Sequence, residues 1–128
     1  MPSASSLAGM LLALAVAFPL AAQERVSSVR LLVQSSPVAG YRYYAAGQVW
    51  NELRIGDALE LVREADNPHD RNAVAVAWRG RKLGYVPKRD NAALAWGLDR
   101  GERLQARVSR LSTHPNPARR IEFQVFVE

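Results

Sequence analysis

Apolar residues recur at every second position in several short runs of this chain, and this period of two constrains the fold more than any other feature. Successive side chains of a strand point to opposite faces of a sheet, so such runs are typical of strands that bury one face. The runs cover residues 29–34, 59–62, 73–78, 83–86, 104–108 and 121–127. We therefore expect a mainly β protein of five or six short strands.

Two of these runs predict a hairpin. Residues 73–78 place two valines and Trp78 on one face and three alanines on the other, and residues 83–86 follow after an Arg-Gly-Arg connection. The glycine of this connection, Gly80, can take the positive φ that a tight hairpin turn requires. The alternation also places Trp78 and Phe123 on the apolar faces of their strands, so we expect both rings in the core.

One stretch departs from the period of two. Asp90 or Asn91 can cap a helix whose apolar residues follow at helical spacing until Gly101, so we predict a short helix near residues 89–99. Residues 47–53 fit either one helical turn or an irregular strand. Short strands interrupted by one or two small helices describe a small β-barrel or a curled sheet.

The N-terminal residues are set apart by their lack of charge. Glu24 is the first charged side chain, and residues 7–22 are all apolar or small. A membrane-spanning helix needs about 20 apolar residues, whereas the core of a signal peptide needs about 7–15 and is followed by small residues. We predict a signal peptide over residues 1–23 and one domain over residues 24–128, exported to the periplasm or secreted. An uncleaved anchor stays open, as does a misassigned start codon, which would leave the protein cytoplasmic.

The composition removes most catalytic and metal-binding chemistry. The chain has no cysteine and only two histidines, which excludes disulfides, cysteine-ligated zinc, iron–sulfur clusters and thiol nucleophiles. Its glycines are scattered singly and form no phosphate-cradling loop. We predict no enzymatic activity, no metal site and no cofactor. The formal net charge of +5, carried mainly by arginine, fits either an anionic partner or a basic protein that binds nothing anionic.

Three stretches carry side chains with binding chemistry, and each also has an ordinary structural explanation. Residues 40–44 set three tyrosines around Arg42, which suits stacking and phosphate pairing or a hydrophobic flap against the barrel. Residues 66–72 are rich in turn-forming Asn, Pro and Asp, and they lack the glycine and distant glutamate of an EF-hand calcium loop. Residues 84–89 place Tyr85 and two cations at a strand exit, as an anion site or a solvated face.

The order of these stretches resembles the HIRAN domain family. The matching segments are 40–44, 59–64, 67–76 and 83–87, and the resemblance extends over about residues 27–127. Its most specific part is an Asn-Pro-x-Asp-x-Asn-Ala motif, followed by an alternating strand and a Gly-Tyr-Val-Pro exit. The resemblance implies a modified OB-like antiparallel β-barrel that, in eukaryotic members, captures the 3′-hydroxyl end of single-stranded DNA.

The resemblance also assigns residues to the binding surface, namely Arg42, Tyr43, Asn67, His69, Asp70, Tyr85 and Lys88. By position, Arg42 and Lys88 would hold backbone phosphates, and Tyr43 would stack on a terminal base. Asp70 would accept a hydrogen bond from the free hydroxyl, because a carboxylate accepts from a hydroxyl but repels a 3′-phosphate.

Two positions depart from the family's pattern. DNA-binding members carry a tyrosine where this chain has His69, and a histidine where it has Tyr85. Histidine can still stack on a base, with a smaller ring. The predicted function is therefore a non-catalytic module that binds single-stranded DNA at a free 3′-hydroxyl end. The alternative, which the predicted export favours, is a periplasmic or surface interaction domain that kept this fold and binds another ligand or protein.

Overall fold

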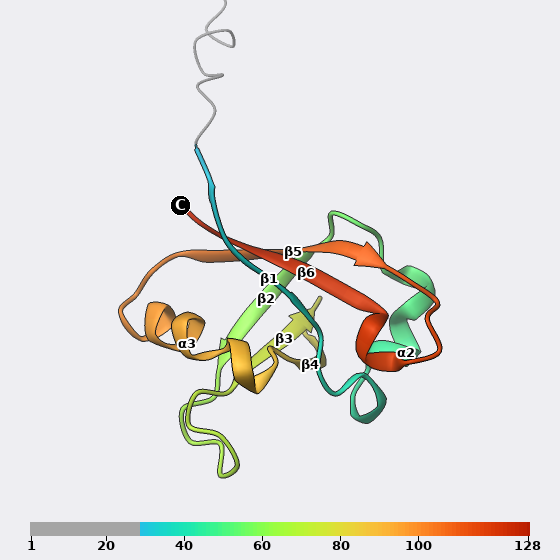
Figure 1. Cartoon of the computed structure of the whole chain (residues 1–128), viewed down its shortest axis with the longest axis horizontal. Coiled ribbons are helices and arrows are strands. Elements are labelled where there is room, and N and C mark those ends of the chain that lie inside the picture. Colours follow the sequence, from blue (N-terminus) through green and yellow to red (C-terminus); the bar gives the residue numbers. More distant parts are fainter. Residues whose placement is uncertain (1–28) are drawn as a thin grey trace, which may run out of the picture.

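The structure, a computed structural model, describes residues 29–128 (Figure 1). The predicted signal peptide, residues 1–23, lies outside the described residues. Within the described range six strands form one antiparallel sheet in the order β1-β6-β5-β2-β3-β4. The strands are β1 (Leu31–Pro37), β2 (Ala58–Arg63), β3 (Val74–Trp78), β4 (Arg81–Tyr85), β5 (Leu104–Leu111) and β6 (Ile121–Val127).

All helices between residues 29 and 128 are short. Four of them are single turns of 3-10 helix, written η, and two are α-helical. They are η2 (Tyr41–Tyr43), α2 (Ala46–Val49), η3 (Trp50–Glu52), η4 (Lys88–Asp90), α3 (Ala92–Asp99) and η5 (Pro117–Arg119). None of these helices has the length and apolar character needed to span a membrane.

The two ends of the sheet come together without closing into a barrel. Just after β1, Ala39 pairs with Tyr85 at the end of β4 through two backbone hydrogen bonds of 2.8 Å. Gly84 permits this approach, because a Cβ atom at that position would lie 2.1 Å from the carbonyl oxygen of Ala39. The predicted mainly β, OB-like fold is therefore confirmed, with a single bridge where a closed barrel would have a full strand pair.

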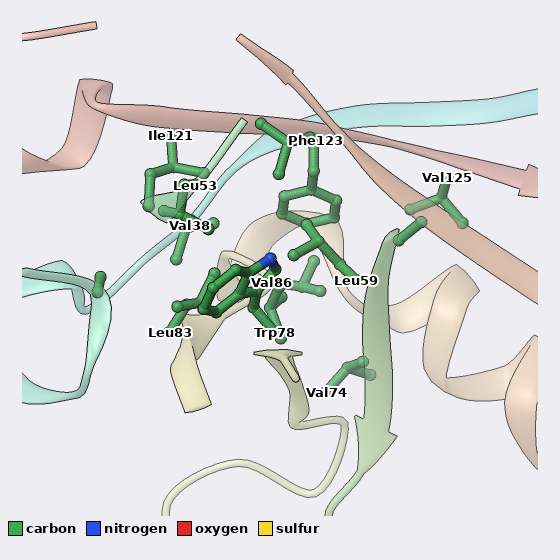
Figure 2. Packing of buried hydrophobic residues seen from close by; sticks show 14 of the residues in the cluster. Val38, Leu53, Leu59, Val74, Trp78, Leu83, Val86, Ile121, Phe123 and Val125 are labelled. Atoms are coloured by element: carbon green, nitrogen blue, oxygen red, sulfur yellow. The ribbon is translucent and has the colours of Figure 1, made fainter. Parts of the chain in front are cut away.

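The core gathers side chains from five strands and from α2 and α3, as Figure 2 shows for part of it. Trp78 and Phe123 are 3% and 0% exposed, which confirms their predicted placement. The indole Nε1 of Trp78 donates to Asp57 Oδ2 at 3.0 Å, so the polar atom of the ring keeps a partner. One core therefore supports the loops at both ends of the sheet.

The hairpin between β3 and β4 forms as predicted. Its two connecting residues, Arg79 and Gly80, have φ values of 47° and 79°. Positive φ at both positions is typical of the type I′ turns that match the twist of paired strands. All five residues of β3 are buried, so its alanine face and its Val/Trp face are both covered. The loop that enters β3 is consequently anchored on a buried strand.

The predicted helix is present as α3, preceded by the single turn η4. Asn91 stands at the N-cap position, but its side chain makes no capping hydrogen bond. It donates instead to Asp70 Oδ2 at 2.7 Å, so the expected capping role is wrong and Asn91 ties the helix to a distant loop. Gly101 follows the helix with a φ of 83°, as expected at a helix end. The ambiguous segment at residues 47–53 is mostly helical.

The first strand differs from its predicted alternation. The side chains of Leu31, Leu32 and Val33 are 63%, 55% and 44% exposed. The strand buries Ser36 instead, whose hydroxyl accepts a hydrogen bond from Gln34 Nε2 at 2.9 Å. Within residues 29–128, β1 is an edge strand of the sheet, and its start lies outside the buried core cluster.

Candidate nucleic-acid interface

A pocket of about 380 Å³ opens where β4 ends, beside the loop that connects β2 to β3. The candidate residues from the sequence that line it are Asn67, His69, Asp70, Tyr85 and Lys88. Ala39, Tyr44 and Val86 add apolar and aromatic surface. We call this hollow the Asp70 pocket.

Side-chain hydrogen bonds shape the loop at residues 64–73, which forms one wall of the Asp70 pocket. Asn67 Oδ1 accepts from the backbone N–H of His69 at 2.8 Å. Asp70 Oδ1 accepts from the backbone N–H of Asn72 at 2.9 Å. Such turns are favoured by Asn and Asp, whose side chains bond to their own backbone two residues on. The loop thereby holds the exposed His69 at the rim of the pocket.

Asp70 supplies the acceptor of the pocket. Its Oδ2 accepts from Nδ2 of Asn91, which is 2% exposed, at 2.7 Å. Each carboxylate oxygen of Asp70 therefore takes one hydrogen bond from the protein, whereas a carboxylate offers about four acceptor positions. Because Asp70 is only half-buried, the remaining positions are open to a donor that enters the pocket.

A hydrogen-bond network around Glu64 joins two residues that line the pocket, Tyr85 and Asn67. Glu64 Oε1 accepts from Tyr85 OH at 2.8 Å and from Asn67 Nδ2 at 3.0 Å. Its Oε2 accepts from Lys82 Nζ at 2.9 Å. Burial raises the pKa of the Glu64 carboxyl, but the three hydrogen bonds together outweigh burial and hold the pKa below its ordinary value.

The charge of Lys82 is used within this network. Hydrogen bonds to Tyr85 and to Glu64 raise the pKa of the Lys82 ammonium well above its ordinary value. The hydrogen bond to Lys82 lowers the pKa of the Tyr85 phenol, but burial and the neighbouring Glu64 leave it raised overall. At neutral pH, Lys82 and Glu64 are therefore both ionised and neutralise each other. Lys88 is the cation of the pocket that stays available to a ligand.

Two tyrosine rings flank the network. Tyr44 and Tyr85 meet edge to face with centroids 5.5 Å apart, and Lys82 Nζ lies 5.2 Å and 4.8 Å from the two centroids. Tyr44 is 39% exposed and lines the pocket, a position that the sequence resemblance had suggested for Tyr43. Tyr43 itself is 80% exposed and lies outside the lining of the Asp70 pocket.

Arg42 and Tyr43 face a neighbouring surface. Both line a shallow hollow together with residues 116–118. Tyr41, from the same turn, packs edge to face on Trp50 with centroids 6.1 Å apart, so for this ring the hydrophobic flap is the correct interpretation. The structure therefore brings five of the seven candidate residues into one pocket and places the other two beside it.

Four residues around the pocket were missed from the sequence, namely Tyr44, Glu64, Lys82 and Asn91. Tyr44 belongs to the tyrosine-rich stretch at residues 40–44, but the sequence pattern does not indicate which of the three tyrosines lines the pocket. Glu64 and Lys82 come together because β2 and β4 flank β3 in the sheet. Asn91 is a polar residue directly before an apolar helix, a pattern that predicts a helix cap and not a hydrogen bond to Asp70.

An open antiparallel sheet with a partly polar surface pocket at the end of β4 defines a small β-domain with a candidate binding site at that end. The family model described as HIRAN domain matches residues 31–128. The chain belongs to the HIRAN domain family, as its motifs indicated. Membership of this family supports the interpretation as a DNA-binding module.

Individual relatives agree with this assignment. The chain is 36% identical over 81 residues to the helicase-like transcription factor of Oryctolagus cuniculus, a match covering 62% of this chain and only 8% of that protein. A solved protein from Lactobacillus plantarum is similar with a TM-score of 0.67 and 28% identity, over 77% of this chain and 95% of that one. The HIRAN domain of human HLTF has a similar fold, with a TM-score of 0.59 and 24% identity over 77% and 78% of the two chains.

Proposed function

We propose that this domain binds single-stranded DNA and holds a free 3′-hydroxyl end in the Asp70 pocket. The observation that carries the proposal is the half-buried carboxylate of Asp70, which keeps acceptor positions unused at the centre of a pocket with a free cation and aromatic rings. Family membership supports DNA binding in general. The preference for one kind of end is our inference from the chemistry of the pocket.

The hydroxyl is recognised by what a carboxylate accepts and repels. A 3′-hydroxyl donates a hydrogen bond to Asp70, whereas a 3′-phosphate would bring negative charge against negative charge. The buried amide of Asn91 holds the carboxylate from behind, so the orientation of Asp70 is fixed before the ligand arrives.

The phosphate and the base of the terminal nucleotide contact the ammonium of Lys88 and the ring of Tyr44 or His69. Lys88 is exposed and takes part in none of the ion pairs among residues 29–128, so its ammonium can pair with a backbone phosphate. A base that stacks on Tyr44 or on His69 gains about 1–3 kcal/mol. Arg42 and Tyr43 line the hollow next along the chain, and in this proposal they contact the next nucleotide.

The test is a fluorescence anisotropy titration of the purified protein with two short strands that differ only in the 3′ end. We expect tighter binding of the strand that ends in a hydroxyl than of the strand that ends in a phosphate. If two or three phosphates are neutralised, log affinity falls with log salt at a slope of roughly −1.4 to −2.1. Equal affinities would overturn the proposal and favour an interaction domain with another ligand.

A substitution at Asp70 separates the pocket from general charge attraction. Asp70→Asn should erase the preference between the two ends, because an amide accepts a hydrogen bond without repelling phosphate. The Asn91 amide can rotate to present its oxygen to the new amide, so the loop keeps its tie. The matched control is Asp66→Asn, which removes the same charge from an exposed residue of the same loop. This control should keep the end preference.

We also propose that the domain acts by binding alone. A general base needs an oriented partner within hydrogen-bond reach, and the side chain of His69 has no hydrogen bond to another side chain of residues 29–128. A labelled strand incubated with the protein should keep its length. Reproducible strand cleavage that His69→Ala abolishes would contradict this part of the proposal.

A further inference from the structure

A second cavity, of about 400 Å³, lies against the loop that joins β5 to β6. Arg89, Arg110 and Arg119 reach it from η4, β5 and η5. Ser112, His114 and Asn116 of the loop add polar surface, and Glu122 is the only carboxylate in the lining. We call this cavity the Arg119 groove.

Hydrogen bonds within the loop use the acceptors of its polar side chains. Ser112 Oγ accepts from the backbone N–H of His114 at 3.1 Å. His114 Nδ1 accepts from the N–H of Asn116 at 2.9 Å. Asn116 Oδ1 in turn accepts from the N–H of Ala118 at 3.0 Å. Three alternate residues of the loop therefore each hold a backbone amide through their side chains.

What remains on these side chains is a set of donors. Because His114 Nδ1 accepts, the proton of the neutral ring sits on Nε2. That N–H, the hydroxyl proton of Ser112 and the Nδ2 amide of Asn116 make no hydrogen bond among those of residues 29–128. The loop thus offers donors to whatever enters the Arg119 groove.

The charges of the groove favour an anion. Arg110 pairs with Glu122 at 3.4 Å, with the two side chains 70% and 38% exposed, and exposed pairs of this kind hold weakly. Arg89 meets only its neighbour Asp90, at 3.6 Å, and Arg119 is in none of the ion pairs of the described residues. A phosphodiester is negatively charged and offers acceptors but no donors, so it complements this lining.

We propose that the Arg119 groove is a second subsite, which binds the phosphodiester backbone of the same DNA strand whose 3′ end lies in the Asp70 pocket. This proposal rests on the proposed function. The turn η4 contributes to both sites, because Lys88 lines the pocket and the next residue, Arg89, lines the groove. Asn116 and Ala118 in turn connect the groove to the hollow of Arg42 and Tyr43. A strand that leaves the pocket along η4 enters the groove.

The first test compares strand lengths on the wild-type protein. The probes are a thymidine trinucleotide and a thymidine strand of roughly 12 nucleotides, both with a 3′-hydroxyl. The longer strand should bind about tenfold more tightly, and its salt slope should be steeper by about 1.4 to 2.1 for two or three further phosphates. Equal affinities and equal slopes for the two lengths overturn the groove proposal.

The second test uses charge variants. Arg119→Gln should weaken binding of the longer strand and reduce its salt slope by about 0.7, while the trinucleotide binds as before. The matched control is Arg103→Gln, because Arg103 is exposed and precedes β5 at the end opposite the groove. Glu122→Gln should have the opposite sign, since it frees Arg110 and removes the carboxylate from the groove. An effect of Arg119→Gln no larger than that of Arg103→Gln contradicts the proposal.

The experiments distinguish an error in the proposed Arg119 groove subsite from an error in the proposed binding of a 3′ end by the Asp70 pocket. A protein that prefers the hydroxyl end but binds both lengths equally contradicts the groove alone. A protein that binds the longer strand through Arg119 without any preference between 3′ ends contradicts the role of the Asp70 pocket, and with it the statement that one strand occupies both sites.

Discussion

Two loops that are built from similar turns present opposite chemistry. The loop at residues 64–73 and the loop at residues 112–120 are both rich in turn-forming polar residues, and in both the side chains accept from nearby backbone N–H groups. They lie at different places on the molecule, between β2 and β3 and between β5 and β6 (Figure 1). The first is tied to Asn91 and Lys82, whereas the side-chain hydrogen bonds of the second stay inside it.

Both loops use side-chain acceptors that bond to nearby backbone N–H groups, yet the two loops present different surfaces. In the first loop, the buried donor of Asn91 fixes Asp70, so the loop offers a carboxylate with unused acceptor positions. In the second loop, Ser112, His114 and Asn116 each accept from a backbone N–H, and their donor groups lie among arginines. The residue types in each loop and the hydrogen-bond partner of each side chain together decide which chemistry faces the ligand.

The largest expected effect comes from a substitution in the shared core, which should destabilise the fold that supports both loops. Phe123 is completely buried in β6, within the core that also contains Trp78 of β3. Phe123→Ala should lower the free energy of unfolding by about 3–5 kcal/mol, from lost burial and the cavity left behind. Urea unfolding measures this loss, with Val62→Ala as control because Val62 is 44% exposed. Two separate transitions in the wild-type curve would contradict a single core.

A smaller effect should fall on one loop only. Asn91→Ala removes the donor that holds Asp70 Oδ2, which should cost about 1–3 kcal/mol and weaken the preference for a 3′-hydroxyl. The helix α3 should remain, because the Asn91 side chain makes no capping bond. Urea unfolding and the two-ended binding assay test this, with Asn51→Ala, an exposed asparagine in η3, as control. An unchanged end preference would mean that Asp70 needs no fixing from behind.

The two loops also mark where sequence reasoning succeeds and where it stops. The sheet, the hairpin and the burial of Trp78 and Phe123 follow from alternation, because a strand with one face in a core must alternate. Asn67, His69 and Asp70 share a pocket wall because they are neighbours in the chain. Local pattern cannot reveal that Asn91 bonds to a residue 21 positions away.

The edge strand β1 is a second place where the sequence prediction differs from the structure. Leu31 and Val33 alternate as in a strand with one face in a core, yet both are exposed in β1, an edge strand of the sheet that residues 29–128 form. Tyr44 lines the Asp70 pocket beside Ala39 and Tyr85, which form the bridge between the two ends of the sheet. This long-range pairing is not visible in the local pattern of residues 40–44.

The charge network of the first loop predicts a pH dependence of stability. The folded-state pKa of Glu64 lies below its ordinary value of 4.5. Its contribution to stability is therefore present above about pH 4.5 and is lost as the pH falls through the folded-state pKa. Glu64→Gln should be less stable than the wild type at neutral pH, and the difference should narrow in acid. Urea unfolding at several pH values measures it, and a constant difference would contradict the network.

The smallest expected effect is on the self-contained loop. Asn116 Oδ1 accepts from the N–H of Ala118 at the start of η5, a capping bond that is exposed to solvent. Asn116→Ala should therefore cost only about 0.5 kcal/mol of stability, at the low end for lost caps. The same change removes an amide donor from the Arg119 groove and loosens the turn that carries Arg119, so the affinity for a longer strand should fall while the 3′-end preference stays. Asn116→Asp sharpens the test, because aspartate keeps the cap but adds a negative charge to the groove. It should preserve stability and weaken long-strand binding more than alanine does, and the reverse order would show that the loop contributes shape rather than donors.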